Sequence, residues 1–212
     1  VPNTQSCVKD LLQEEQQHRI ESRIKRLISQ AKFPTIKLFS EFNFTAVPSL
    51  NKEKVCDLSA CHFINEKSNV CFLGQTGTGK THLATAIAYE SCKKCIPTLF
   101  FSAAKLVNGF IDARKQHRLS EYQKKISKAK LLVIDELGYI PFSTEGAEHL
   151  FQCFSDAYEK QSIIVTSNLE FSDWTSFMGN TTMTSALLDR FTHNCDILML
   201  NGDSYRFKHR KK

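Results

Sequence analysis

The stretch Gly74-Gln75-Thr76-Gly77-Thr78-Gly79-Lys80-Thr81 decides the fold of this 212-residue chain. It matches every position of the pattern G-x-x-x-x-G-K-[ST], in which backbone N–H groups and the start of a helix surround the phosphates of a nucleotide. The apolar residues 70–73 before it are typical of a buried strand, and residues 81–88 after it are typical of a helix. Because this context is right, a chance glycine-rich turn is a poor explanation, and we predict a nucleotide-binding protein.

Two side chains of this stretch have predicted roles in holding ATP and Mg²⁺. Lys80 is expected to reach the β- and γ-phosphates, and the Thr81 hydroxyl is expected to lie where Mg²⁺ binds between them. The residues expected to surround the nucleotide are Gly74, Gln75, Thr76, Gly77, Thr78, Gly79, Lys80, Thr81 and His82.

A second run typical of a buried strand, residues 130–136, ends in the two carboxylates Asp135 and Glu136. Ligands of parallel sheets bind at the carboxyl ends of the strands, so both acids are expected beside the phosphates. Asp135 would hold the metal together with Thr81, and Glu136 would polarise the water that attacks the γ-phosphate. The alternative is that the two acids cap the next helix.

Three further polar residues are candidates for the same site. Asn168 follows the apolar run 163–166, and it is equally well interpreted as a residue that positions water or as a turn residue. Arg190 and Arg206 could each stabilise charge on the γ-phosphate, from the same chain or from a neighbour. Composition alone favours solvated surface arginines at both positions.

Beyond the phosphate loop, the chain resembles the IstB-type ATP-binding proteins, accessory ATPases encoded beside the transposase of bacterial insertion sequences. The stretches that carry the resemblance are 31–34, 42–44, 74–84, 132–141, 145–147, 167–168, 171–174, 186–191 and 202–206. This family belongs to the AAA+ ATPases, in the clade of replication initiators and the helicase loader DnaC. The resemblance implies a five-stranded parallel sheet of order 5-1-4-3-2. It also implies Asn168 as first sensor, Arg190 as a finger acting on a neighbouring subunit's nucleotide, and Arg206 as second sensor.

The chain departs from the family pattern at both ends. The family usually begins with about one further helical segment before the equivalent of Val1, so we expect a shortened N-terminus, which would affect partner binding more than nucleotide binding. About a dozen residues follow the last expected strand, too few for the separate helical lid domain of many AAA+ proteins. Arg206 would therefore have to reach the pocket from a short tail.

We expect a protein of the cytoplasm, because its predicted function depends on ATP, and composition predicts that it has no membrane segment. The chain is 42% hydrophobic and 24% charged, and no apolar run approaches the ~18 residues of a spanning helix. No signal-peptide pattern is present in the first residues. The eight cysteines are expected to be reduced. A zinc site that combines Cys92 and Cys95 with Cys56, Cys61 and His62 is less favoured than ordinary packing.

The pattern of apolar residues predicts three regions: a short helical N-terminal arm over 1–32, a connecting segment over 33–69, and an α/β ATPase core with a basic tail over 70–212. Ile20, Ile24, Leu27, Ile28 and Ala31 share one face of the arm. A short helix is expected at 51–65. The core strands are expected near 70–73, 98–102, 131–135, 163–166 and 196–200, and its helices near 80–93, 103–114, 144–160 and 183–192.

The formal net charge is +6, and three clusters of basic residues stand out along the chain. One lies on the N-terminal arm, one between the second and third strands, and one over 206–212. A solvated face is the usual fate of such a cluster, but three of them in an ATPase favour DNA binding. The middle cluster is our first choice, with sequence-independent contacts to DNA phosphates. Its expected DNA-binding residues are Arg114, Lys115, Arg118, Lys124, Lys125 and Lys128.

These observations predict an ATPase that assembles on double-stranded DNA as a homo-oligomer when ATP is bound. It would recruit or stimulate its cognate transposase and leave after hydrolysis, which would be slow without DNA. The alternatives are a DnaC-type helicase loader, a DNA scaffold that does not use nucleotide, and, more remotely, a small-molecule kinase. The intact Lys80, Asp135 and Glu136 argue against the scaffold.

Overall fold

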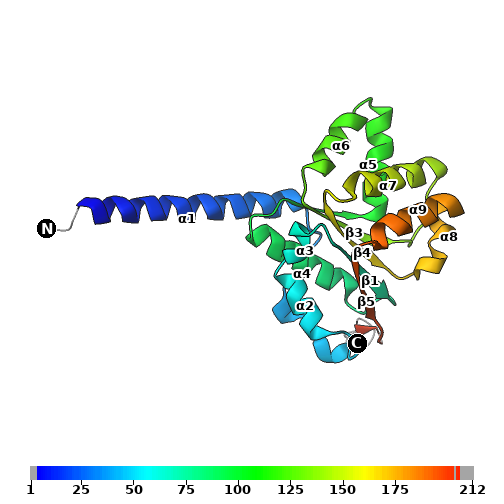
Figure 1. The fold of residues 1–212 in the computed structure, drawn as a ribbon, viewed down its shortest axis with the longest axis horizontal. Helices are drawn as coiled ribbons and strands as arrows, with labels where there is room; N and C mark the ends of the chain where they lie inside the picture. Colours follow the sequence, from blue (N-terminus) through cyan, green and yellow to red (C-terminus); the bar gives the residue numbers. More distant parts are fainter. Residues whose placement is uncertain (1–3, 203, 206–212) are drawn as a thin grey trace, which may run out of the picture.

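The computed structural model describes residues 4–202 and 204–205, and it places a parallel five-stranded sheet at the centre of the chain (Figure 1). The strands are β1 (Asn69–Gly74), β2 (Thr98–Ser102), β3 (Leu131–Leu137), β4 (Ser162–Ser167) and β5 (Cys195–Leu200). Their order across the sheet is β2-β3-β4-β1-β5, which is the expected order read from the other edge. The predicted sheet is therefore confirmed, with every strand within a residue or two of its expected bounds.

Side chains of each central strand alternate between two hydrophobic layers, because successive residues of a strand point to opposite faces. In β1, Val70 and Phe72 contact one layer, whereas Cys71 and Leu73 contact the other. All four are almost completely buried. The continuous apolar run at 70–73 thus reflects a strand that is covered on both faces, as expected for parallel sheets.

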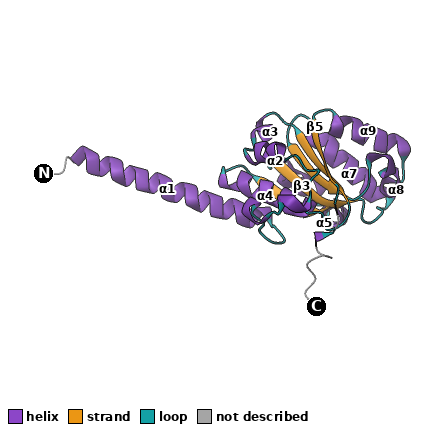
Figure 2. Cartoon of the chain, turned by 90° about the horizontal axis from the view of Figure 1, so that it is seen from below, coloured by secondary structure: helices purple, strands orange, loops and turns teal. Residues whose placement is uncertain are grey.

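Helices cover both faces of the sheet (Figure 2). One layer is formed by α2 (Lys52–Ser59), α3 (His62–Asn65) and α4 (Lys80–Lys93). The other contains α5 (Ala103–Lys115), α6 (Leu119–Ser127), α7 (Thr144–Ala157), α8 (Thr175–Met178) and α9 (Thr181–Thr192). Three short 3₁₀ helices, Phe39–Glu41, Phe44–Ala46 and Phe171–Asp173, lie in the connections. Residues 44–65 contribute buried side chains to the first layer, so much of the connecting segment is part of the core.

The N-terminal helix α1 (Thr4–Ala31) projects from the body as a straight rod (Figure 1). Its last turns pack on the body, with Leu27 and Ala31 buried against Cys92. Ile20, which was expected to share a face of the helix with these two residues, is 47% exposed.

Several helix predictions need correction. The single helix expected at 51–65 is two helices, α2 and α3, separated at Cys61, whose φ of 62° interrupts the helical backbone. The helix expected to end at residue 160 stops at Ala157. Helix α6 was not predicted, although Leu119, Tyr122 and Ile126 recur at helical spacing and pack on the core.

No helix of the described chain is long and apolar enough to cross a membrane. Seven of the cysteines whose side chains the structure describes are free, namely Cys56, Cys61, Cys71, Cys92, Cys95, Cys153 and Cys195. Burial raises the pKa of the Cys61 and Cys92 thiols to about 11, which keeps both in the neutral form suited to packing. Among the described residues, no three His, Cys, Asp or Glu side chains lie close enough together to hold a metal ion.

Candidate active site at the carboxyl edge of the sheet

The phosphate loop connects the end of β1 to the start of α4, as the sequence predicts. Two of its glycines are required by close contacts as well as by backbone angles. A Cβ on Gly74 (φ 144°) would lie 2.3 Å from the carbonyl oxygen of Leu200, and one on Gly79 (φ 97°) would lie 2.6 Å from the Phe42 ring. Any larger residue at these positions would force the loop and its neighbours apart.

Lys80, the first residue of α4, bends back over the phosphate loop. Its Nζ donates hydrogen bonds to the carbonyl oxygens of Gly74 (2.6 Å) and Gln75 (2.8 Å). Within the loop, the Thr78 hydroxyl donates to the Gln75 carbonyl at 2.9 Å. The ammonium group is thus held at the loop that the sequence predicts will surround the phosphates.

Thr81 and Asp135, the two predicted metal-holding residues, are in direct contact. The Thr81 hydroxyl donates to Asp135 Oδ1 at 2.9 Å, and the Thr166 hydroxyl donates to the same oxygen at 2.5 Å. Hydroxyl and carboxylate oxygens are ligands that Mg²⁺ accepts, with water and phosphate oxygens completing its shell. The residues present therefore fit a Mg²⁺ ion held between a nucleotide and the sheet.

Glu136 lies beside Asp135 but points into open space at the cavity. The φ of Glu136 is 60°, and the pairing of β3 with β4 is irregular between Ile134 and Leu137. The Glu136 N–H donates to the Thr166 hydroxyl at 2.9 Å. This irregularity turns the exposed carboxylate toward the cavity while Asp135 stays 5% exposed. The helix-capping alternative is wrong, because β3 continues to Leu137 and Ser143 caps α7.

A cavity of about 1160 Å³ joins these residues at the carboxyl ends of the strands. The predicted site residues that line this cavity are Thr76, Gly77, Thr78, Gly79, Lys80, Thr81, His82, Asp135, Glu136 and Asn168. Asn168 is exposed directly after β4. The structure thus brings it to the cavity, while its role in positioning water stays a prediction.

The connecting segment forms the opposite wall of the cavity, which the sequence did not predict. His82 Nε2 lies 2.8 Å from the Leu38 carbonyl, and the His82 ring meets the Phe42 ring edge-on with centroids 5.3 Å apart. Tyr205 also lines the cavity, and its N–H donates to the Gly77 carbonyl at 3.0 Å. His82 therefore connects this segment to the start of α4. Two stretches that carry the family resemblance, 31–34 and 42–44, contribute residues to this wall.

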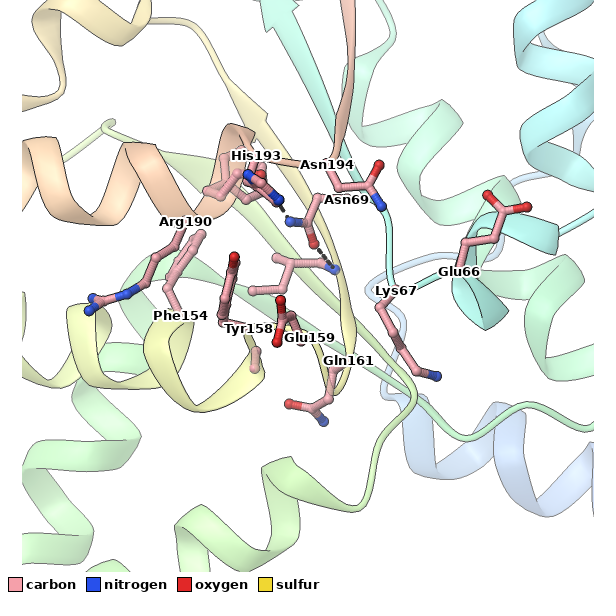
Figure 3. A pocket seen from close by; sticks show the side chains of 13 residues that line it. Glu66, Lys67, Asn69, Phe154, Tyr158, Glu159, Gln161, Arg190, His193 and Asn194 are labelled. Carbon is pink, nitrogen blue, oxygen red and sulfur yellow. Dashed lines mark hydrogen bonds between the residues drawn. The ribbon is translucent and has the colours of Figure 1, made fainter.

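Arg190 lies at the other end of the sheet (Figure 3). It borders a smaller hollow of about 370 Å³ together with Asn69, at the start of β1, and Asn194, just before β5. Six-residue strands separate this edge from the cavity by roughly 20 Å. The structure does not bring Arg190 to the cavity of its own chain, and Arg206 lies outside the described residues.

The predicted DNA-binding residues gather on the α5–α6 hairpin. Arg114 pairs with Glu145 (3.2 Å) and Arg118 pairs with Glu121 (2.9 Å), so both guanidinium charges are partly compensated. Lys115, Lys124, Lys125 and Lys128 are exposed. Of the other two basic clusters, the one at 206–212 lies outside the described residues.

The sheet order, the phosphate loop and the adjacent acids define the fold of P-loop nucleotide-binding proteins. Solved structures with this fold include AMPPCP-bound DnaA from Aquifex aeolicus (TM-score 0.68, 19% identity, covering 84% of this chain and 54% of that one). The DnaC helicase loader is also similar (TM-score 0.60, 23% identity, covering 70% and 87%).

The chain belongs to the family of IstB-like ATP-binding proteins, whose family model matches residues 3–212. It is 36% identical over 190 residues to the "Insertion sequence IS232 putative ATP-binding protein" of Bacillus thuringiensis subsp. berliner, covering 90% of this chain and 76% of the relative. It is also 36% identical over 196 residues to the "Insertion sequence IS21 putative ATP-binding protein" of Pseudomonas aeruginosa, covering 92% and 72%. The predicted family is confirmed.

Proposed function

We propose that this protein hydrolyses ATP in the cavity at the carboxyl edge of the sheet and uses the ATP-bound form to assemble on DNA as a transposition helper. The observation that carries the ATPase proposal is the Thr81–Asp135 contact beside the exposed Glu136 and below the phosphate loop. Thr81 and Asp135 would hold Mg²⁺, which neutralises phosphate charge. Glu136 would accept a proton from the attacking water, and Asn168 would help to position that water.

Arg190 acts in the site of a neighbouring subunit in this proposal. It lies at the amino edge of the sheet, whereas the nucleotide cavity lies at the carboxyl edge. A head-to-tail arrangement brings one subunit's amino edge to the next subunit's cavity, and such an interface is heterologous. Hydrolysis would then be slow for an isolated subunit and faster after assembly. Arg206 is retained as a candidate second sensor from the resemblance alone.

Double-stranded DNA is the proposed surface for assembly, and the exposed lysines of the α5–α6 hairpin support this choice. Lysines that contact phosphates bind DNA without sequence preference and lose affinity as salt rises. The relatives are named as proteins of insertion sequences, which supports a cognate transposase as the partner. One similar solved structure is titled as replication initiator DnaA bound to AMPPCP and single-stranded DNA. The proposed place of action is the cytoplasm, where ATP and the DNA are available.

The size of the complexes formed on duplex DNA tests whether ATP binding switches assembly on. We expect large complexes with ATP, small ones with ADP, and none with ATP for the Lys80→Ala variant. Assembly of Lys80→Ala that equals the wild type would refute the switch and support a scaffold that does not use nucleotide.

A helicase loader is the second candidate function, because the fold is shared with the DnaC helicase loader. Capture of the purified chain by its transposase but not by the replicative helicase supports the transposition helper, and the reverse result supports the loader.

A further inference from the structure

We propose that Ser155 and Phe151 of α7 are positioning residues that hold Arg190 ready for a neighbouring subunit's ATP. This inference rests on the proposed role of Arg190 in trans. The Arg190 Nη1 donates to Ser155 Oγ at 3.0 Å, and its guanidinium carbon lies 5.1 Å from the centre of the Phe151 ring. Both contacts come from the helix that packs beside α9.

The chemistry of these contacts fixes Ser155 as an acceptor. Its hydroxyl hydrogen is directed to the Phe151 carbonyl, with an Oγ to O distance of 2.9 Å. The lone pairs of Oγ are left to accept from Arg190. The Phe151 ring lies against the guanidinium and attracts it through its π electrons. Two independent contacts thus restrict a long side chain that otherwise samples many rotamers.

Neutral partners leave the charge of Arg190 uncompensated. Among the described residues, Arg19, Arg114 and Arg118 each form an ion pair with a glutamate, and Arg190 is in none of the ion pairs. A hydroxyl and a ring orient the guanidinium without supplying a negative charge. The side chain therefore keeps its positive charge for an incoming anion, such as the γ-phosphate of a neighbour.

The direction of the side chain agrees with this role. Figure 3 shows the Arg190 guanidinium pointing away from His193 and Asn69, toward α7, whereas the Asn69 amide is used within the chain. The Asn69 amide nitrogen donates to the Phe191 carbonyl (2.9 Å), and its oxygen accepts from the Ile163 N–H (2.9 Å). Asn69 therefore fixes the end of α9 against β1 and β4, and it fixes the backbone that carries Arg190.

A mixing experiment tests the proposal through ATP hydrolysis on duplex DNA. The Glu136→Gln variant lacks the catalytic carboxylate but keeps its arginine, and Arg190→Ala lacks the arginine but keeps its carboxylate. We expect Ser155→Ala to lower the DNA-stimulated kcat by about 10- to 100-fold with an unchanged KM for ATP, because a misplaced catalytic group loses rate and not substrate affinity. Ser155→Thr, which keeps the hydroxyl, should retain activity, as should the control Gln152→Ala on the exposed side of α7.

Subunit mixtures separate positioning from a general loss of structure. An equal mixture of Ser155→Ala with Glu136→Gln should regain activity at roughly a quarter of its interfaces, because intact arginines then meet intact acids in a head-to-tail assembly. The mixture with Arg190→Ala should not regain it. Phe151→Leu should behave as Ser155→Ala does.

The outcomes distinguish this inference from the function on which it rests. An unchanged or higher rate of ATP hydrolysis for Ser155→Ala overturns the positioning role while leaving the role of Arg190 intact. Equal rescue of Ser155→Ala by Glu136→Gln and by Arg190→Ala does the same. No loss of rate for Arg190→Ala overturns both.

Discussion

Thr166 joins the two acids of the candidate site, and its replacement by valine is the most informative single change. The side chain is 1% exposed, and its hydroxyl both donates to Asp135 Oδ1 (2.5 Å) and accepts from the Glu136 N–H (2.9 Å). Valine has nearly the same shape but can make neither bond. The change therefore isolates the hydrogen bonds from the packing.

The expected cost follows from the two lost contacts. A hydrogen bond to a charged group contributes about 1.5–3 kcal/mol, and one between neutral groups about 1 kcal/mol. We expect Thr166→Val to lower the free energy of unfolding by about 3 kcal/mol. For a domain of this size, that corresponds to a fall in Tm of about 6–12 °C. ATP hydrolysis should fall at least about tenfold, because Asp135 and Glu136 lose the group that fixes them relative to each other.

Thr184→Val is the matched control. Thr184 is 2% exposed, and its hydroxyl donates to a neutral carbonyl, that of Asn180, at 2.7 Å. We expect a loss of about 1 kcal/mol and no change in hydrolysis. Differential scanning calorimetry and a phosphate-release assay measure both quantities. If Thr166→Val loses no more stability than the control and hydrolyses ATP at the wild-type rate, the Thr166 hydroxyl does not fix Asp135 and Glu136 for hydrolysis.

Three further predictions test separate parts of the molecule. Gly79→Ala should weaken ATP binding at least about tenfold in an equilibrium titration, because its Cβ would meet the Phe42 ring at a φ of 97°; wild-type affinity would show that the loop adapts freely. Exposed Cys56 should react with iodoacetamide between pH 7 and 9 while Cys61 and Cys92 stay protected, because burial raises their pKa to about 11; mass spectrometry of the alkylated peptides checks this, and equal labelling would contradict it. Replacing Lys124, Lys125 and Lys128 together by alanine should reduce the slope of log K for DNA against log salt by up to about 3, as measured by fluorescence anisotropy; an unchanged slope would exclude this hairpin as the DNA surface.

The parts of the site that the sequence predicted are those defined by local pattern. Lys80 and Thr81 follow β1 through one short loop, and Asp135 and Glu136 lie near the carboxyl end of β3. The carboxyl ends of parallel strands meet at one edge of the sheet, so the meeting of these residues follows from the strand assignments. The contact between Thr81 and Asp135 confirms that inference.

The contacts that the sequence missed join residues far apart in the chain. His82 meets the carbonyl of Leu38, 44 positions away, and Arg190 meets Ser155, 35 positions away. No periodicity reports which turn of one helix packs on another, so these partners required the structure. Helix α6 is different, because the helical spacing of Leu119, Tyr122 and Ile126 is visible in the sequence. The basic residues between them favoured an interpretation as a charged cluster instead.

Glu136 is proposed to activate the water that attacks ATP, in a site that DNA stimulates. The most direct test is the rate of phosphate release by the purified chain with and without duplex DNA, for the wild type and for Glu136→Gln. We expect the wild type to hydrolyse ATP slowly without DNA and clearly faster with it. We expect Glu136→Gln to bind ATP without DNA-stimulated hydrolysis. A DNA-stimulated rate that Glu136→Gln retains, or a wild-type rate that DNA does not change, would contradict this proposal.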